Sequence, residues 1–129
     1  MDNFKVLVVD DELDFLETIV KRLKARKIEV TGVESGFKAL DAVMAQDVDV
    51  VILDVKMPGM DGIETLREMK KKQPLVEVIM LTGHASVESG IQGMQLGAFD
   101  YVMKPVALDE LLEKMRQAYE RKLINQGKV

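Results

Sequence analysis

The chain has 129 residues, of which 47% are hydrophobic, and a formal net charge of -4. This length and apolar content predict one folded domain with a buried core rather than a disordered chain. The absence of cysteine excludes disulfides and thiolate metal sites. The negative charge argues against nucleic-acid binding by this chain. We find no secretory signal and no apolar run near the ~18 residues of a membrane span, so we expect a cytosolic protein with no membrane partner.

Short apolar runs alternate with longer segments of helical periodicity, which predicts five βα units. We expect strands over residues 5–10, 28–33, 49–54, 76–82 and 98–103. We expect helices over 12–26 and 37–45, a third from Asp61 to Gln73, a fourth capped by Ser86 and a fifth that begins near Leu108. Asp61 and Glu64 have the spacing of a capping box at the start of the third helix.

The composition of the five apolar runs predicts their positions in a sheet. The first, third and fourth runs are almost continuously apolar, as strands buried on both faces are. The second alternates apolar and polar residues and the fifth is interrupted by Asp100, so these two are the expected edges. With the first and third strands as neighbours, the prediction is a doubly wound parallel α/β sheet in the order 2-1-3-4-5, with right-handed crossovers.

Four of the five runs end on a polar residue suited to phosphoryl chemistry. Asp10 and Asp11 end the first run, Asp54 the third, Thr82 the fourth and Lys104 the fifth. Ligands of open parallel sheets bind beyond the carboxyl ends of the strands, so we expect these side chains to meet at one edge. Three carboxylates together require a cation. Oxygen ligands without sulfur or a histidine pair suit Mg²⁺.

Asp54 stands alone at its strand end, where it can act as a nucleophile and form an aspartyl-phosphate. The metal and Lys104 would neutralise the phosphoryl oxygens, and Thr82 would donate a hydrogen bond to one of them. Taken singly, each residue has an ordinary explanation as a helix cap, a strand threonine or a solvated loop lysine. Their coincidence at four strand ends favours a phosphoryl-handling site.

Four motifs carry a resemblance to a known family. They are Val-Val-Asp-Asp-Glu at 8–12, Leu-Asp-Val-Lys-Met-Pro-Gly-Met-Asp-Gly at 53–62, Leu-Thr-Gly-His-Ala at 81–85 and Tyr-Val-Met-Lys-Pro at 101–105. With these motifs the chain resembles the receiver domain of two-component response regulators, which has a flavodoxin-like fold. The resemblance covers about residues 4–122 of a single domain over 1–129, with 123–129 as a tail. The family has the same 2-1-3-4-5 order, so that order is not an independent result.

The resemblance implies roles for the acidic residues. Asp54 is the implied phosphoacceptor. Asp11, Asp54 and the backbone carbonyl of Lys56 are the implied Mg²⁺ ligands, and Asp10 supports the ion mainly through water. The Lys104–Pro105 peptide bond is expected to be cis, although most bonds before proline are trans.

The resemblance also implies a switch. Thr82 and Lys104 contact the phosphoryl group, and Tyr101 is the aromatic switch residue. The ordinary explanation for Tyr101 is an edge-strand aromatic that covers apolar surface. Gly90 and Gly93 each cost about 1 kcal/mol relative to alanine inside a helix, which suits a fourth helix that shifts position. The expected output surface consists of helix 4, strand 5 and helix 5.

The implied phosphodonor is a sensor histidine kinase or a phosphotransfer protein. The signal would pass to an output domain, an effector protein or a second copy in a homodimer. The domain would promote its own phosphotransfer and dephosphorylation rather than act as an enzyme on other substrates. Lys56 and His84 occupy the two positions that tune phosphate lifetime in the family, and each also has an explanation as an exposed residue. The run 70–72 is interpreted as the solvated end of a helix.

Three other functions fit an α/β fold. An aspartyl-nucleophile phosphatase of the haloacid-dehalogenase type would place a second aspartate two positions after the first, but here Asp54 is followed by Val55 and Lys56. A flavodoxin-like electron carrier would meet acidic loops where the flavin phosphate must bind. A nucleotide-binding enzyme would need a glycine-rich loop where Asp10 and Asp11 stand. These patterns favour the signalling function.

Overall fold

The structure is a computed structural model that describes residues 3–83 and 87–127. Five parallel strands form one sheet in the order β2-β1-β3-β4-β5, which confirms the predicted order and both predicted edges. The strands are β1 (Lys5–Val9), β2 (Glu29–Val33), β3 (Val50–Asp54), β4 (Glu77–Thr82) and β5 (Asp100–Met103). The helices are α1 (Leu13–Ala25), α2 (Gly36–Ala45), α3 (Gly62–Lys72), α4 (Val87–Gln95) and α5 (Leu108–Asn125).

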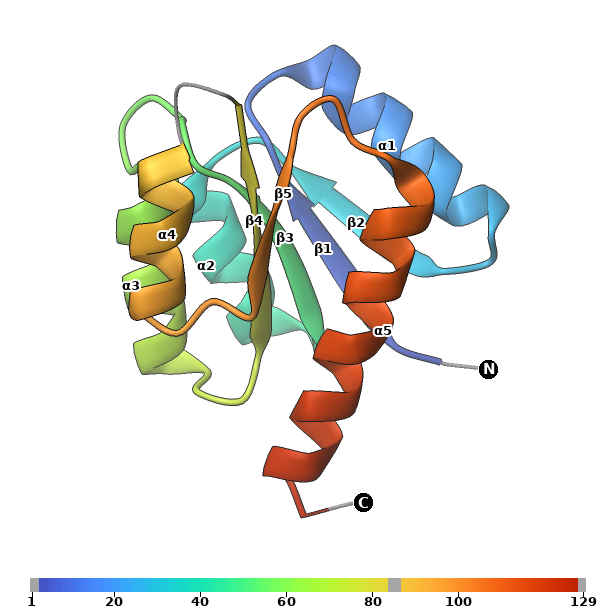
Figure 1. Cartoon of the computed structure of the whole chain (residues 1–129), viewed down its shortest axis with the longest axis vertical. Helices are drawn as coiled ribbons and strands as arrows, with labels where there is room; N and C mark the ends of the chain where they lie inside the picture. Colours follow the sequence, from blue (N-terminus) through green and yellow to red (C-terminus); the bar gives the residue numbers. More distant parts are fainter. Residues whose placement is uncertain (1–2, 84–86, 128–129) are drawn as a thin grey trace.

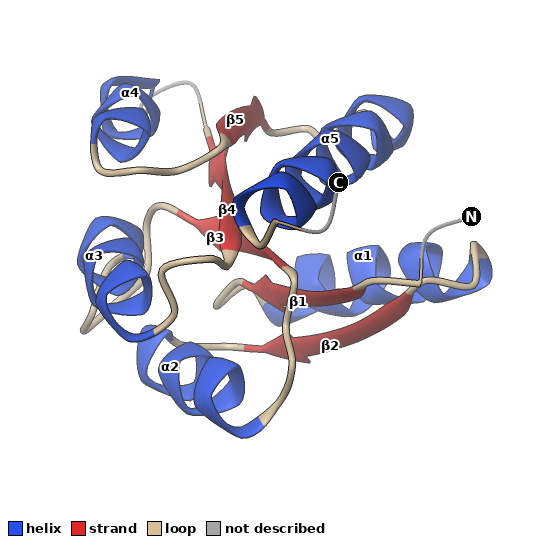
Figure 2. Cartoon of the chain, turned by 90° about the horizontal axis from the view of Figure 1, so that it is seen from below, coloured by secondary structure: helices blue, strands red, loops and turns tan. Residues whose placement is uncertain are grey.

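The molecule has three layers, with α1 and α5 on one face of the sheet and α2, α3 and α4 on the other (Figures 1 and 2). Successive strand residues point to opposite faces, so a strand buried on both sides divides its residues between two cores. In β1, Val6 and Val8 pack with α1 and α5, whereas Leu7 and Val9 pack with α2 and α3. This is the physical reason for the nearly continuous apolar runs.

The helix ends agree with the local sequence signals where the structure describes them. The Asp61 carboxylate accepts a hydrogen bond from the Glu64 amide at 2.9 Å, which confirms Asp61 as the cap of α3. The hydroxyl of Ser35 caps α2 in the same way at 3.2 Å. The predicted cap Ser86 lies outside the described residues. Helix α5 continues to Asn125, so residues 123–125 extend it into the segment expected to be a tail.

One interpretation of the charged residues was wrong. Lys70 was expected to lie on a solvated helix end with its two neighbours. Instead its ammonium donates to the carbonyls of Pro74 at 2.9 Å and Val76 at 2.8 Å, in the turn that follows α3. Burial lowers the pKa of Lys70. The lysine therefore closes the turn that leads into β4, while Lys71 and Lys72 remain exposed.

Two ion pairs connect α5 with the amino end of the sheet. Glu77, at the start of β4, is buried and accepts two hydrogen bonds from Arg121, at 2.6 and 2.8 Å. The Arg121 guanidinium also lies 4.8 Å from the centre of the Phe99 ring. Lys122, one residue farther along α5, pairs with Asp49 just before β3. The buried Glu77 and Lys122 at this end thus each have an oppositely charged partner.

Candidate functional site

Asp10, Asp11 and Asp54 meet at the carboxyl end of the sheet, as predicted. One carboxylate oxygen from each lies within 4.8 Å of the others. Strands β1 and β3 are neighbours with Val9 opposite Leu53, so the residues that follow them lie side by side. Asp10 and Asp54 are buried, and Asp11 is half-buried.

The packing of α3 fixes the position of the Asp54 backbone. A Cβ at Gly62 would lie 2.3 Å from the Asp54 carbonyl oxygen and 2.7 Å from the Val55 Cα, so only glycine fits there. The Gly62 amide donates to the Val55 carbonyl at 2.8 Å. The first turn of α3 therefore rests directly on the end of β3.

The carboxylates carry more negative charge than the surrounding residues neutralise. Burial, followed by the nearby charges of Asp10 and Asp11, raises the pKa of Asp54 to about 7, although Lys104 opposes the shift. Burial also raises the pKa of Asp10, against hydrogen bonds from Lys104 and from the Glu12 amide. A site of this kind favours a bound cation, because a positive ion relieves both the burial cost and the mutual repulsion of the carboxylates.

Lys104 reaches the acidic cluster from the far side of β4. Its ammonium lies 2.9 Å from Asp10 Oδ2 and 3.6 Å from Asp54 Oδ1, which confirms that a long side chain spans the gap. It also lies 3.1 Å from Glu12 Oε1 and 4.5 Å from the centre of the Phe15 ring. Burial lowers the pKa of Lys104, but the hydrogen bonds to Asp10 and Glu12 outweigh it and raise the pKa to about 12.

Sequence reasoning missed the roles of Glu12 and Phe15 beside Lys104. Glu12 was noted only within a motif, and Phe15 sits in the helical pattern of α1 without a signal of its own. Their contacts with Lys104 join residues about ninety positions apart. The Lys104–Pro105 bond is cis, as the resemblance implied.

Thr82 ends β4 between the strands that carry Asp54 and Lys104. The residue is buried, and within the described residues its hydroxyl oxygen has no hydrogen-bond partner. Buried hydroxyls are nearly always paired, so this oxygen is available to a group that enters the site. The Thr82 carbonyl accepts from the Lys104 amide at 2.7 Å, which couples the ends of β4 and β5.

Helix α4 packs closely against both expected switch residues. A Cβ at Gly90 would lie 3.0 Å from the Thr82 methyl carbon and 3.2 Å from the Tyr101 ring. A Cβ at Gly93 would lie 3.0 Å from Met80 Cγ. The glycines, expected only to weaken the helix, therefore also allow it to approach the sheet. Tyr101 is half-buried against the apolar cluster of β3 and β4, so its packing role is real.

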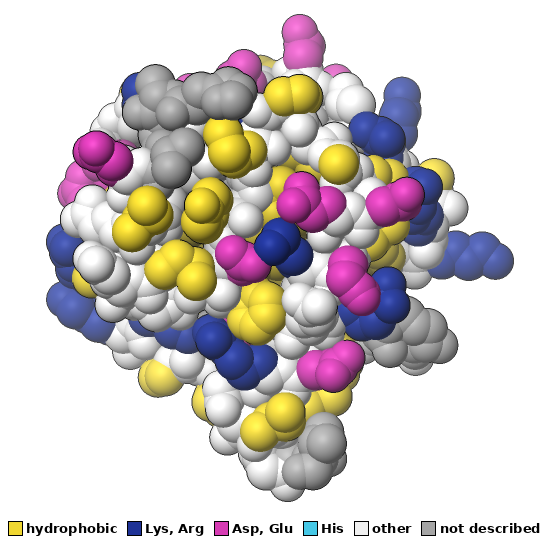
Figure 3. Space-filling model, in the orientation of Figure 1, with side chains coloured by type: hydrophobic (Ala, Val, Ile, Leu, Met, Phe, Trp, Pro, Cys, Tyr) yellow, Lys and Arg dark blue, Asp and Glu magenta, His cyan; other side chains and the backbone are white. Residues whose placement is uncertain are grey.

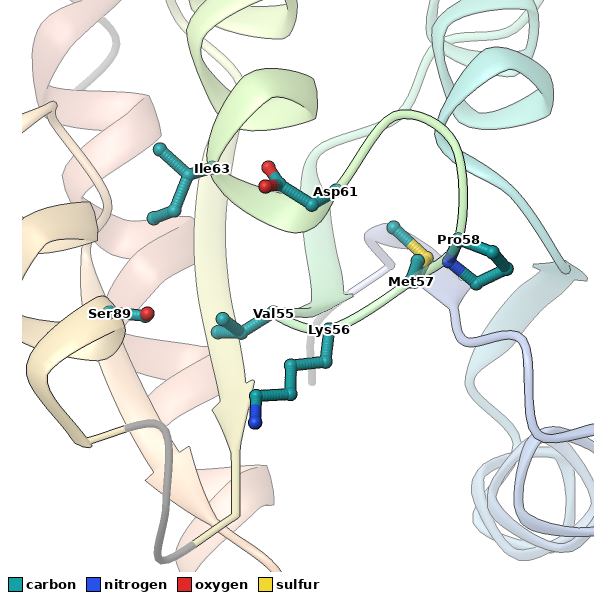
Figure 4. Close-up of a pocket in the computed structure, with 7 residues that line it drawn as sticks. All are labelled: Val55, Lys56, Met57, Pro58, Asp61, Ile63 and Ser89. Atoms are coloured by element: carbon teal, nitrogen blue, oxygen red, sulfur yellow. The ribbon is translucent and has the colours of Figure 1, made fainter.

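An open pocket of about 500 Å³ lies between the loop that follows Asp54 and helix α4. Figure 4 shows the loop after β3, with Lys56, Met57 and Pro58, on one side of this pocket and Ser89 of α4 on the other. Lys56 is exposed. His84, the second residue expected to tune phosphate lifetime, lies outside the described residues.

The family is established by comparison with known proteins. The model of the response regulator receiver domain matches residues 6–116. The chain therefore belongs to the response regulator receiver domain family, the signalling domain of two-component response regulators. This is the family that the motifs predicted, rather than the phosphatase or the electron carrier.

Two of the relatives are longer bacterial regulators. The transcriptional regulatory protein ZraR of Escherichia coli K12 is 37% identical over 117 residues, which are 91% of this chain and 26% of ZraR. The DNA-binding transcriptional regulator NtrC of Klebsiella pneumoniae is 34% identical over 111 residues, 86% of this chain and 24% of NtrC. The chain thus spans about a quarter of the length of these relatives.

The fold also matches solved structures. A response regulator receiver domain protein from Clostridium thermocellum has a TM-score of 0.89 and 38% identity, over 94% of this chain and 98% of that one. The agreement extends to the five-stranded parallel sheet and its order. Among the described residues, no helix combines the length and the apolar character needed to cross a membrane.

Proposed function

We propose that the domain accepts a phosphoryl group on Asp54 from a sensor histidine kinase or a phosphotransfer protein. The observation that carries the proposal is the convergence of three carboxylates within 4.8 Å with a lysine ammonium 3.6 Å from Asp54. In the transfer, a carboxylate oxygen of Asp54 bonds to phosphorus while the phosphorus–nitrogen bond of the donor breaks. The departing imidazole then takes up a proton.

The residues at this edge fit a magnesium ion. The candidate ligands are oxygens of Asp11 and Asp54 and the backbone carbonyl of Lys56, with Asp10 acting mainly through water. The raised pKa of Asp54 supports this assignment, since it reflects negative charge without sufficient compensation. When bound, Mg²⁺ would neutralise the carboxylates and the phosphoryl oxygens.

Thr82 and Lys104 complete the proposed site. The hydroxyl of Thr82 would donate to a phosphoryl oxygen, which would satisfy a buried group that has no partner among residues 3–83 and 87–127. The Lys104 ammonium would pair with a second phosphoryl oxygen. Hydrolysis by water would return Asp54 to the carboxylate. The domain would thereby promote its own dephosphorylation, and Lys56 and His84 occupy the two positions that tune its rate in the family.

We propose that Thr82 and Tyr101 transmit the signal to an output surface formed by α4, β5 and α5. Phosphorylation adds about one negative charge at Asp54, toward which Thr82 and Lys104 would move. Contact through Gly90 supports joint movement of Thr82, Tyr101 and α4. Hydrophobic side chains gather over α4 in Figure 3, and its Ile91 and Met94 are exposed. This surface suits an output domain, an effector protein or a second copy.

The extent of the functional unit is also a proposal. We assign residues 1–129 to a single receiver domain with its core over about 4–122. Because ZraR and NtrC are about four times longer than the segments that match this chain, an output partner fused to the domain fits the proposal as well as a separate one.

Replacing Asp54 tests the function. Intact-mass spectrometry after treatment with acetyl phosphate and Mg²⁺ should detect one added phosphoryl group in the wild type and none in Asp54→Asn, because the amide is a near-isostere without nucleophilic charge. Asp41→Asn, at an exposed position of α2, should be phosphorylated like the wild type. Equal incorporation in Asp54→Asn would show that the acceptor is elsewhere.

Hydrogen exchange with and without a beryllofluoride phosphoryl mimic tests the switch. Protection should change in the segment 83–104 as well as in the loops after β1 and β3. Changes confined to those two loops would rule out transmission through α4.

A further inference from the structure

The ammonium of Lys104 rests on an aromatic ring that belongs to a different element. Phe15, in the first turns of α1, places the centre of its ring 4.5 Å from Lys104 Nζ. This distance lies within the roughly 6 Å over which a cation is attracted to a ring face. The same ammonium lies 2.9 Å from Asp10 and 3.6 Å from Asp54. Lys104 Nζ is therefore in reach of both the ring and the acidic cluster.

Phe15 is better suited than Glu12 to hold this side chain in place. The Glu12 side chain is 67% exposed, so water and salt screen its attraction for Lys104. Phe15 is half-buried and packs against the core beneath α1, which fixes its ring. A lysine has a flexible four-carbon stem that otherwise samples many rotamers. A fixed ring face restricts those rotamers.

We propose that Phe15 is a positioning residue that holds the Lys104 ammonium beside Asp54, ready to receive a phosphoryl oxygen. The inference rests on the proposed function, because the reaction it assists is phosphotransfer to Asp54. Phe15 does not touch the reacting atoms and acts through Lys104. Its part is to reduce the loss of side-chain freedom when the ammonium pairs with the phosphoryl group.

The contact itself can be observed by NMR on the wild-type chain. Protons over a ring face are shielded, so the ε-methylene protons of Lys104 should resonate upfield of those of the exposed lysines. Phe15→Leu should remove this displacement, and Phe15→Tyr should retain it. An ordinary shift for Lys104 in the wild type would overturn the inference without bearing on phosphorylation of Asp54.

The kinetic test measures phosphorylation by acetyl phosphate with saturating Mg²⁺, using intact-mass spectrometry. Phe15→Leu should lower the rate constant by about three- to tenfold, the range expected from losing a partly desolvated cation–π contact. Phe15→Tyr keeps a ring face and should restore a rate near that of the wild type, since a pocket of about 290 Å³ beside the ring gives room for the hydroxyl. Phe37→Leu, on the exposed side of α2, is the matched control and should leave the rate unchanged.

The Lys104→Ala background separates positioning from a general structural effect. There, Phe15→Leu should cause no further loss of rate, because the ammonium that it positions is gone. An equal loss in both backgrounds, or a wild-type rate in Phe15→Leu alone, would overturn the inference. If the wild type itself accepted no phosphoryl group, the proposed function would fail, whereas failure of the Phe15 variants alone would leave that function intact.

Discussion

Charged side chains are paired one to one at the amino end of the central sheet and share a partner at its carboxyl end. At the amino end, Glu77 has its own bidentate partner in Arg121, and Lys122 has its own partner in Asp49. At the carboxyl end, Lys104 serves three carboxylates at once and leaves their negative charge in excess. The first arrangement supports the fold.

The shared arrangement at the carboxyl end lowers the stability of the fold, and its excess negative charge favours the binding of a cation. A cluster whose burial and mutual repulsion raise the pKa of Asp54 to about 7 is not one that folding alone would favour. The same sheet therefore separates a balanced end, which anchors α5, from an unbalanced end, which holds the candidate site. Four experiments test that contrast.

Removing the negative charge of Asp54 should have the largest effect on the free energy of unfolding. The folded pKa of Asp54 exceeds its unfolded value, so the folded state binds more protons between about pH 4 and pH 7 and loses stability as the pH rises through that window. Without metal, Asp54→Asn should be more stable than the wild type at pH 8 by on the order of 2–4 kcal/mol, with a smaller gap at pH 5. Urea unfolding at both pH values measures it.

Asp41→Asn serves as the control for this measurement, because the carboxylate that it removes is exposed. It should change the unfolding free energy by no more than about 0.5 kcal/mol at either pH. If the difference in unfolding free energy between Asp54→Asn and the wild type were the same at pH 5 and pH 8, the assignment of excess charge to Asp54 would be wrong.

Breaking the Arg121–Glu77 pair at the amino end should change the free energy of unfolding slightly less. Arg121→Ala leaves the buried Glu77 carboxylate without its partner and should lower the unfolding free energy by about 2–3 kcal/mol, below the usual range for a buried pair because the arginine is partly exposed. Arg116→Ala removes a surface pair with Glu113 and should cost less than about 1 kcal/mol. Similar losses of unfolding free energy for the two variants, measured with urea, would show that the buried pair contributes no more to stability than the surface pair.

Magnesium should distinguish the two ends by binding at only one of them. At ten times its dissociation constant, Mg²⁺ should stabilise the wild type by about 1.4 kcal/mol, measured at constant ionic strength. Asp11→Ala should lose much of this gain, whereas Asp49→Asn, at the amino end, should keep it. Equal stabilisation of both variants would place the ion away from the carboxyl-end cluster.

The smallest effect on stability is expected at Gly90. Alanine there gains about 1 kcal/mol of helix propensity but crowds Thr82 and Tyr101, so the net change should stay within about 1 kcal/mol. The structural response should be clearer than the energetic one, with the largest NMR shift changes at Thr82 and the Tyr101 ring. Changes spread evenly over α4 would argue against a local contact.

Periodicity and strand-end chemistry predicted most of the fold and the members of the acidic cluster. The apolar runs indicate which strands are buried on both faces, and the carboxyl ends of parallel strands must share one edge. Asp10, Asp11, Asp54, Thr82 and Lys104 follow from those two facts. The distances confirm that the three aspartates and Lys104 lie together, and Thr82 ends the strand between Asp54 and Lys104. The roles of all five residues in phosphotransfer stay predictions.

The missed contacts have a common cause. Glu77 and Arg121 are 44 positions apart, and Glu12 and Lys104 are 92 apart, on elements whose relative rotation no local pattern specifies. Lys70 was misplaced for a similar reason, because its carbonyl partners come from the turn after the helix. Side-chain pairing of this kind depends on how helices pack against the sheet, which the linear sequence does not encode in any short motif.

The absence of a side chain at Gly62 has a consequence for how the site tolerates sequence change. The end of β3 is held by direct backbone packing, so the chemical group at position 54 can be exchanged while its location stays the same. Position 62 has no such freedom, because any added carbon enters the space of the Asp54 carbonyl. The proposed phosphoacceptor therefore depends on two positions, because residue 54 supplies the carboxylate and residue 62 leaves the space that keeps it in place. A substitution at position 62 should displace Asp54 even though every charged group of the site is still present.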